Sequence, residues 1–137
     1  MLRFAIWLQM FRTDIDVPRT RHRHLCRSPN FFRALRQPCG PRHIVEHTVT
    51  SVFGVDELDL QVSSRGRAHV ALARQAAMYL SHVGLGLTMA EVGMLFERDR
   101  TTVGHACAII EDRRDDRNFD LALELLERAI HALNAPR

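Results

Sequence analysis

A row of polar and cationic side chains begins the segment after residue 98, in the order Asp99, Arg100, Thr101 and Thr102, with His105 one helical turn later. At the first turn of a helix such groups hold anions, because the main-chain amides point outward and the helix dipole is positive there. Arginine presents a fork of donors that matches a phosphate or the O6 and N7 atoms of guanine. A threonine methyl can also touch the methyl of thymine. The row therefore predicts recognition of a polyanion rather than catalysis.

The spacing of these residues leaves a second interpretation open. Asp99 is also a good N-cap residue, and Thr101 and Thr102 are tolerated in the first turn of any helix. From the spacing alone, DNA binding and an ordinary helix start are equally consistent with the row.

Hydrophobic residues recur at helical spacing from about residue 42 onward, and no segment alternates as a strand does. The first helix is expected to stop at Gly54, and a long Ala-rich helix to end at Gly84 or Gly86. The expected inner faces are Ile44, Val45, Val49, Val52 and Phe53 in the first helix, and Val70, Ala73, Ala77 and Leu80 in the second.

Thr88 and Glu91 form a capping box at the start of a short helix, which is followed by a turn at 97–99 and by a helix over about 99–114. Two helices joined by a tight turn, the second opening with polar and cationic groups, predict a helix-turn-helix inside a compact all-α bundle. The expected inward residues are Met89, Val92, Leu95 and Phe96, then Val103, Ala106 and Ile110, and in a last amphipathic helix Phe119, Ala122, Leu126, Ala129 and Leu133.

The charge is unevenly distributed along the chain. Residues 1–43 contain nine arginines and two acidic residues, a net charge of +7, whereas residues 44–137 contain ten arginines and fourteen acidic residues, a net charge of −4. Residues 1–41 show no sustained period and are expected to form a flexible basic arm. Residues 42–137 are expected to form the folded domain.

Several classes of protein are disfavoured by the sequence. The three cysteines and the lack of a convincing secretory signal suggest a reducing cytosol, and the apolar run from Phe4 to Phe11 is shorter than the roughly 20 residues that span a bilayer. The chain contains no lysine and therefore no G-x-x-x-x-G-K-[ST] phosphate loop. We expect a cytoplasmic, nucleoid-associated protein that is not an enzyme and has no cofactor, membrane partner or small-molecule substrate.

Two alternatives of other classes stay open. The first is a zinc-binding protein, although the spacing of the possible ligands matches no known pattern and no metal site is expected. The second is a helical module that binds another protein through the last helix. An enzyme using Cys107 is weaker, because this cysteine lies between two alanines in a helix and is expected to be packed. The possible zinc ligands are His22, His24, Cys26, Cys39 and His43.

The stretches "ARQAAMYL" and "LTMAEVGMLFERDRTTVGHACAII" carry a specific resemblance. Together they resemble the C-terminal DNA-binding domain of the bacterial replication initiator DnaA, over about residues 43 to 133. The resemblance implies a helical bundle with a helix-turn-helix of the kind also found in the Trp repressor, and binding to short duplex sites of the DnaA-box type. The matching residues are Arg74, Gln75, Ala77, Met78, Tyr79, Leu80, Glu91, Gly93, Phe96, Arg98, Asp99, Thr101, Thr102, Val103, His105, Ala106 and Ile110.

The resemblance also implies roles for individual residues. Asp99, Thr101 and Thr102 would face the major groove, while His105, Arg74 and Gln75 would lie against the DNA backbone. Arg65 and Arg67 would correspond to a basic loop that reaches the minor groove, and Thr88 would also lie in the DNA-binding surface. The family usually has histidine where this chain has Arg100, a longer and fully charged group that would strengthen backbone contact or change base preference.

The ATPase module of the full initiator has no counterpart in this sequence. We therefore expect a stand-alone regulator of replication initiation or of transcription, which occupies DnaA-type sites and competes there with the full-length initiator.

Overall fold

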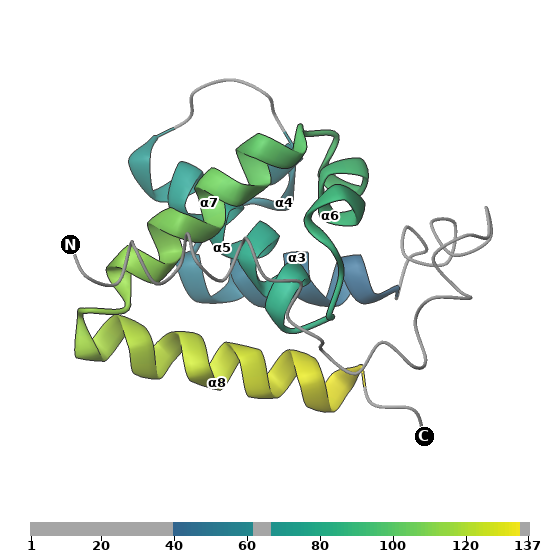
Figure 1. Ribbon diagram of the computed structural model, residues 1–137. Coiled ribbons are helices and arrows are strands. Elements are labelled where there is room, and N and C mark those ends of the chain that lie inside the picture. The colour runs from purple at the N-terminus through teal and green to yellow at the C-terminus, as the bar shows by residue number, and fades with distance from the viewer. Residues whose placement is uncertain (1–39, 62–66, 135–137) are drawn as a thin grey trace. The chain divides into compact units, whose positions relative to one another are not determined.

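The computed structural model describes residues 40–61 and 67–134. These residues form six helices and no strand, which confirms the predicted all-α fold (Figure 1). The helices are α3 (Pro41–Phe53), α4 (Glu57–Gln61), α5 (Ala68–Val83), α6 (Met89–Phe96), α7 (Arg100–Arg113) and α8 (Arg117–Leu133). Of the expected arm over 1–41, only Gly40 and Pro41 lie within the described residues, and Pro41 is the first residue of α3.

The ends of the helices follow from local sequence signals. Gly54 closes α3 in the left-handed conformation, with φ +62°. Thr88 opens α6 with the predicted capping box, since its side chain accepts from the amide of Glu91 while the Glu91 side chain accepts from the amide of Thr88. Asp116 caps α8 by accepting from the amides of Asn118 and Phe119.

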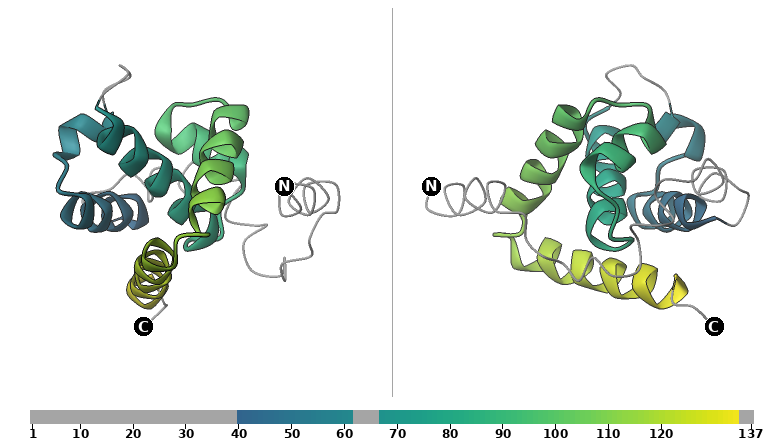
Figure 2. Two further views of the ribbon diagram at one scale, coloured as in Figure 1. Left: turned by 90° about the vertical axis from the view of Figure 1, so that its left-hand side faces the viewer. Right: turned by 45° about the vertical axis from the view of Figure 1, so that its right-hand side comes forward.

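Helix α5 is the centre of the bundle and packs against α3, α4, α6, α7 and α8 (Figures 1 and 2). Its alanines allow close approach of the neighbouring helices, and its predicted inner residues are all buried. The turn after α5 is also tight, because a Cβ at Gly84 would lie 3.1 Å from the Cγ2 atom of Ile130. This close approach lets α8 pack across the end of α5.

Two of the predicted inner faces need correction. Val52 was expected to face inward but is 56% exposed, because the buried face of α3 runs instead through Val45, Glu46, Val49 and Thr50. In α8 the predicted face was wrong by about one residue. The buried residues are Leu123, Leu126 and Ile130, with Phe119 half-buried, whereas Ala122, Ala129 and Leu133 are exposed.

Two arginines connect helices that are distant in sequence. Arg42 on α3 donates to the carbonyl oxygen of Leu95 at 2.7 Å and to Glu46 at 2.8 Å, and its guanidinium lies 5.3 Å from the centre of the Phe96 ring. It thereby satisfies a carbonyl at the C-terminal end of α6, which has no partner within its own helix. This contact fixes α6 against α3.

Arg114, at the C-terminal end of α7, also connects different helices. Its guanidinium donates to Asp120 at 2.6 Å, to the Tyr79 hydroxyl at 2.8 Å and to Glu127 at 3.1 Å. The three partners belong to α8 and α5, so one side chain ties three helices together. A buried tyrosine hydroxyl needs such a partner, because leaving it unpaired costs about 1–3 kcal/mol.

Candidate nucleic-acid interface

The turn between α6 and α7 is closed by main-chain hydrogen bonds. Glu97 adopts the left-handed conformation with φ +56°, and the amide of Arg98 donates to the carbonyl oxygen of Gly93 at 2.8 Å. A Cβ at Gly93 would lie 2.5 Å from the carbonyl oxygen of Arg98, which is closer than real Cβ contacts. Glycine at 93 therefore lets the turn fold tightly against α6 and fixes the point where α7 begins.

The predicted polar row occupies the exposed start of α7. Asp99, Arg100, Thr101, Thr102 and His105 are all exposed. The opposite face of α7 packs into the bundle, as predicted, through Val103, Ala106 and Ile110. The row is therefore presented by a helix whose other side is anchored in the core.

The side chain of Asp99 does not cap α7, although its residue type suggested that role. It is the N-cap residue of α7, and its carbonyl oxygen accepts from the amide of Val103 at 3.1 Å. Its carboxylate, however, accepts no hydrogen bond from the first turn of the helix. The expected side-chain cap is thus not formed in the described structure, and the amides at the start of α7 keep their capacity to bind an external anion.

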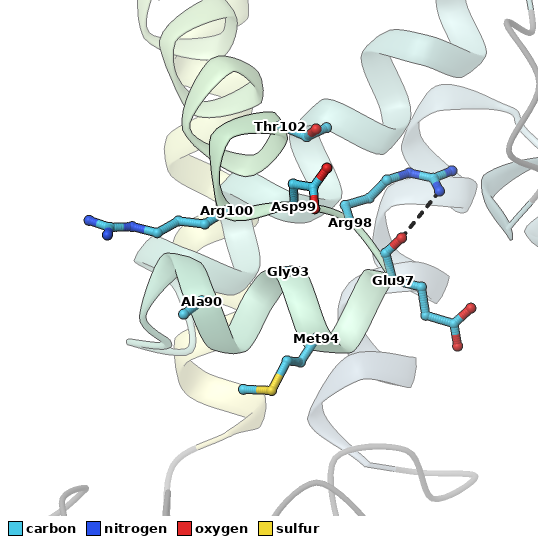
Figure 3. A pocket seen from close by; sticks show the side chains of 8 residues that line it. All are labelled: Ala90, Gly93, Met94, Glu97, Arg98, Asp99, Arg100 and Thr102. Carbon is cyan, nitrogen blue, oxygen red and sulfur yellow. Dashed lines mark hydrogen bonds between the residues drawn. The ribbon is translucent and has the colours of Figure 1, made fainter.

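A shallow pocket of about 550 Å³ lies at the junction of the two helices (Figure 3). The side chains of Arg98 and Arg100 leave the turn in opposite directions, so that cationic groups stand on both sides of it, as Figure 3 shows. The guanidinium of Arg98 donates to the carbonyl oxygen of Glu97 at 3.3 Å. The lining residues are Ala90, Gly93, Met94, Glu97, Arg98, Asp99, Arg100 and Thr102.

The site residues predicted outside α7 have varied surroundings. Arg67 is exposed directly before α5, and Gln75 is partly exposed on α5. Arg74 donates to the carbonyl oxygen of Asp59 through Nε at 3.1 Å and Nη2 at 2.7 Å. This arginine therefore holds α4 against α5, a structural role that the sequence did not suggest. Arg65 lies outside the described residues.

Thr88 is exposed but its hydroxyl is already engaged. It donates to Glu91 Oε2 at 2.8 Å and accepts from the Glu91 amide at 3.3 Å. Glu91 is buried, with 7% of its surface exposed, so the capping box also pairs a carboxylate that would otherwise be costly to bury. The amide of Thr88 donates to Glu91 Oε2 at 2.7 Å and its carbonyl oxygen accepts from the amide of Val92 at 2.9 Å, so Thr88 is used to define the start of α6.

The alternative functions considered from the sequence depend on Cys107 or on a cluster of metal ligands. Cys107 is buried, and burial raises the pKa of its thiol to about 12, so it is packed as predicted. Of the possible zinc ligands only His43 is described, and residues 40–61 and 67–134 contain no group of three or more His, Cys, Asp or Glu side chains placed to hold a metal ion. In the same residues no helix has the length and apolarity needed to cross a membrane.

Comparison with known proteins agrees with this geometry. A model of the family described as "Bacterial dnaA protein helix-turn-helix" matches residues 42–110, a segment that extends from α3 to α7 and includes the polar row. No part of α8 lies within the matched segment.

Curated relatives are chromosomal replication initiator proteins DnaA. The protein of Desulfotalea psychrophila is 34% identical over 84 residues, which are 61% of this chain and 17% of that protein. The protein of Thermomicrobium roseum is 39% identical over 82 residues, 59% of this chain and 17% of that protein. The protein of Mesorhizobium japonicum is 37% identical over 89 residues, 64% of this chain and 18% of that protein. The chain thus spans less than a fifth of the length of these relatives.

Proposed function

This chain belongs to the bacterial DnaA helix-turn-helix family, and from that membership we propose that it binds double-stranded DNA sequence-specifically, at short sites of the DnaA-box type. The observation that carries the proposal is the exposed row Asp99, Arg100, Thr101 and Thr102 at the start of a helix whose opposite face is buried. A rigid helix end of this kind fits the major groove and presents its first residues to base edges.

Each residue of the row has a distinct chemical role in this proposal. The Arg100 guanidinium donates to guanine or to a phosphate, and the methyl and hydroxyl groups of Thr101 and Thr102 contact thymine methyls and phosphate oxygens. The Asp99 carboxylate is not used as a helix cap and would accept from a cytosine amine. Together these groups can distinguish base pairs, which a purely electrostatic surface cannot do.

The supporting contacts are phosphate contacts that set the register on the duplex. Arg67, Gln75 and His105 are placed at the surface in the described structure, and we assign them to the DNA backbone. Arg65 would reach the minor groove from the segment before α5. We assign Arg74, which also donates to the Asp59 carbonyl oxygen, to the DNA backbone as well.

The folded domain is acidic overall, but its charge distribution favours an orientation in which the start of α7 faces the DNA. The segment 111–127 contains seven acidic residues and three arginines, and it includes the C-terminal end of α7 and the first part of α8. Glu111, the first of these acidic residues, lies 11 positions after Arg100, which is about 16 Å along the helix because an α-helix rises 1.5 Å per residue. That distance is about twice the Debye length at physiological ionic strength, so the acidic end is largely screened from DNA at the start of α7.

We further propose that the protein regulates replication initiation or transcription by occupying its sites. A protein bound at a DnaA-box-like site excludes a second protein that needs the same groove. Competition with a full-length DnaA initiator for such sites is the simplest form of this regulation.

Fluorescence anisotropy with a labelled duplex that carries a DnaA-box-like site tests the proposal, with a shuffled duplex of the same composition as reference. We expect preference for the site, and we expect Thr102→Ala or Arg100→Ala to weaken binding by about 1–3 kcal/mol with unchanged helix content. Arg117→Ala is the matched control, because Arg117 is exposed at the start of α8, away from the row. Equal binding of the two duplexes would refute sequence-specific recognition.

A further inference from the structure

Helix α8 carries apolar side chains on two faces, and only one of them is used inside the bundle. Leu123, Leu126 and Ile130 are buried, whereas Leu121, Leu125 and Leu133 are 50%, 65% and 63% exposed. We call the exposed face the outer stripe. It consists of Leu121, Ala122, Leu125, Ala129, Ala132 and Leu133, all exposed and spaced by steps of three and four residues.

The outer stripe differs from an ordinary scatter of exposed apolar residues. Single exposed leucines are common on proteins, but contiguous apolar surface along a helix marks a site of contact. The residues 122, 125, 129 and 132 also follow the alternating steps of three and four that let one helix pack along another. The stripe therefore has the pattern of a helix–helix interface.

Charged residues at the edge of the outer stripe indicate which partner helix can pack against it and in which orientation. Glu124 and Arg128 stand on the same edge, 3.7 Å apart, with 41% and 77% of their side chains exposed. In an antiparallel pair of helices related by a two-fold axis, the same edge of each helix meets, with its order reversed. Glu124 of one copy then faces Arg128 of the other copy, and this pairing occurs twice.

The apolar residues and the charged residues place the two-fold axis at nearly the same position along α8. The midpoint of residues 122 and 132 is 127, and the midpoint of Glu124 and Arg128 is 126. These positions differ by one residue, or about 1.5 Å along a helix. One two-fold axis therefore brings both the stripes and the opposite charges together.

From these relationships we propose that the outer stripe of α8 binds the outer stripe of a second copy of this chain, in antiparallel orientation. Nucleic acid is a poor occupant of this face, because the acidic segment 111–127 includes the first half of α8. An anionic lipid surface is disfavoured for the same reason.

The position of α8 makes this pairing compatible with DNA binding. The views of Figures 1 and 2 agree that α8 lies at the end of α7 opposite to the start that carries the polar row. Both rows of the dimer therefore stay open. The inference that the dimer holds two DNA sites at once rests on the proposed function. The pairing of the two α8 helices does not depend on that function, so its test is carried out without DNA.

Sedimentation equilibrium of the full 137-residue chain measures the association. We expect the average mass to rise with concentration from 15.7 kDa toward twice that value. Leu125→Gln should leave a folded monomer, because the side chain is 65% exposed and contributes little to the core. Leu58→Gln is the matched control, since Leu58 is 72% exposed on α4, and it should associate as the parent does.

Charge reversal provides a sharper test of the antiparallel order. Glu124→Arg and Arg128→Glu should each weaken self-association by about tenfold, since like charges then face each other across the axis. An equimolar mixture of these two variants should regain the parent's association, because every pair in the mixed dimer is again opposite in sign. A parent chain that stays at 15.7 kDa at every concentration, or a mixture that associates no better than either variant, would overturn the proposal.

Discussion

The carbonyl oxygen of Gly93 accepts the main-chain amide of Arg98 at 2.8 Å, and the carbonyl oxygen of Arg98 lies where a side chain at residue 93 would begin. The two residues bracket the turn between α6 and α7. Because α7 begins two residues after Arg98, this contact sets the position of every group in the polar row.

Substitution of Gly93 by alanine should therefore disturb both stability and DNA binding. The new Cβ would lie 2.5 Å from a main-chain oxygen that cannot rotate away, and such overpacking costs about 1–3 kcal/mol. Urea denaturation should show a lower midpoint, and the variant should lose affinity for its DNA site even at temperatures where it is folded. A variant as stable as the parent would show that the turn is less constrained than the geometry indicates.

The glycine in α7 should respond in the opposite way. A Cβ at Gly104 would meet only the Sδ atom of Met89, at the ordinary contact distance of 3.7 Å. Since alanine favours a helix interior over glycine, Gly104→Ala should raise the free energy of unfolding by about 0.5–1 kcal/mol. The same urea titration measures the gain, and a loss of stability would mean that α6 and α7 pack more closely than this distance.

The protein should lose stability in alkaline solution. Burial, together with the hydrogen bond and charge of Glu111, raises the pKa of Tyr79 well above its ordinary range, and burial raises the pKa of Cys107 from about 9 to about 12. Both groups keep their protons in the folded chain at pH values where the unfolded chain releases them. Their contribution is complete below about pH 9 and is lost above it, by up to about 1.4 kcal/mol per pH unit for each group.

Urea midpoints between pH 8 and pH 11 measure this dependence, and Tyr79→Phe should reduce it above pH 10. Tyr79 is the only tyrosine of the chain, so the ultraviolet absorbance of tyrosinate reports its titration directly. Appearance of tyrosinate near pH 10 in the folded protein would contradict the raised pKa.

Much of the fold could be predicted from the sequence because local signals were strong. Gly54 and the Thr88–Glu91 capping box stand at the helix ends where they were expected, and the buried faces of α5 and α7 are the predicted ones. The inner face of α8 was wrong because that helix is apolar over two neighbouring faces. Periodicity alone cannot decide which of these faces contacts the bundle.

The exposure of the candidate site could be predicted from the sequence, but the long-range hydrogen bonds that hold its helices in place could not. The exposure of Asp99 to Thr102 follows from the burial of Val103, Ala106 and Ile110, which is a local pattern. Arg42 and Arg114, in contrast, bind partners 53 and 35 residues away, and no local pattern shows such distances. Only the spacing of Arg42 and Glu46, four residues apart, is a local signal of a helical ion pair.

Removal of residues 1–39 should lower affinity for specific and random duplexes alike. The arginine excess of the first 43 residues lies mostly in this segment, and cationic side chains neutralise phosphates regardless of the DNA sequence. The slope of log K against log salt should fall by about 0.9 for each phosphate that the shortened chain no longer neutralises, while the preferred site stays the same. Identical salt slopes with and without the segment would show that it does not contact DNA.

Selection from a random duplex library tests most directly whether the start of α7 reads base pairs. The full chain and Arg117→Ala should enrich one common motif related to the DnaA box. Arg100→His should shift the selected bases, and Thr102→Ala should lose information at specific positions of the motif. If no motif is enriched, or if these two variants at the start of α7 select the same motif with the same information as the parent, the proposed recognition is contradicted.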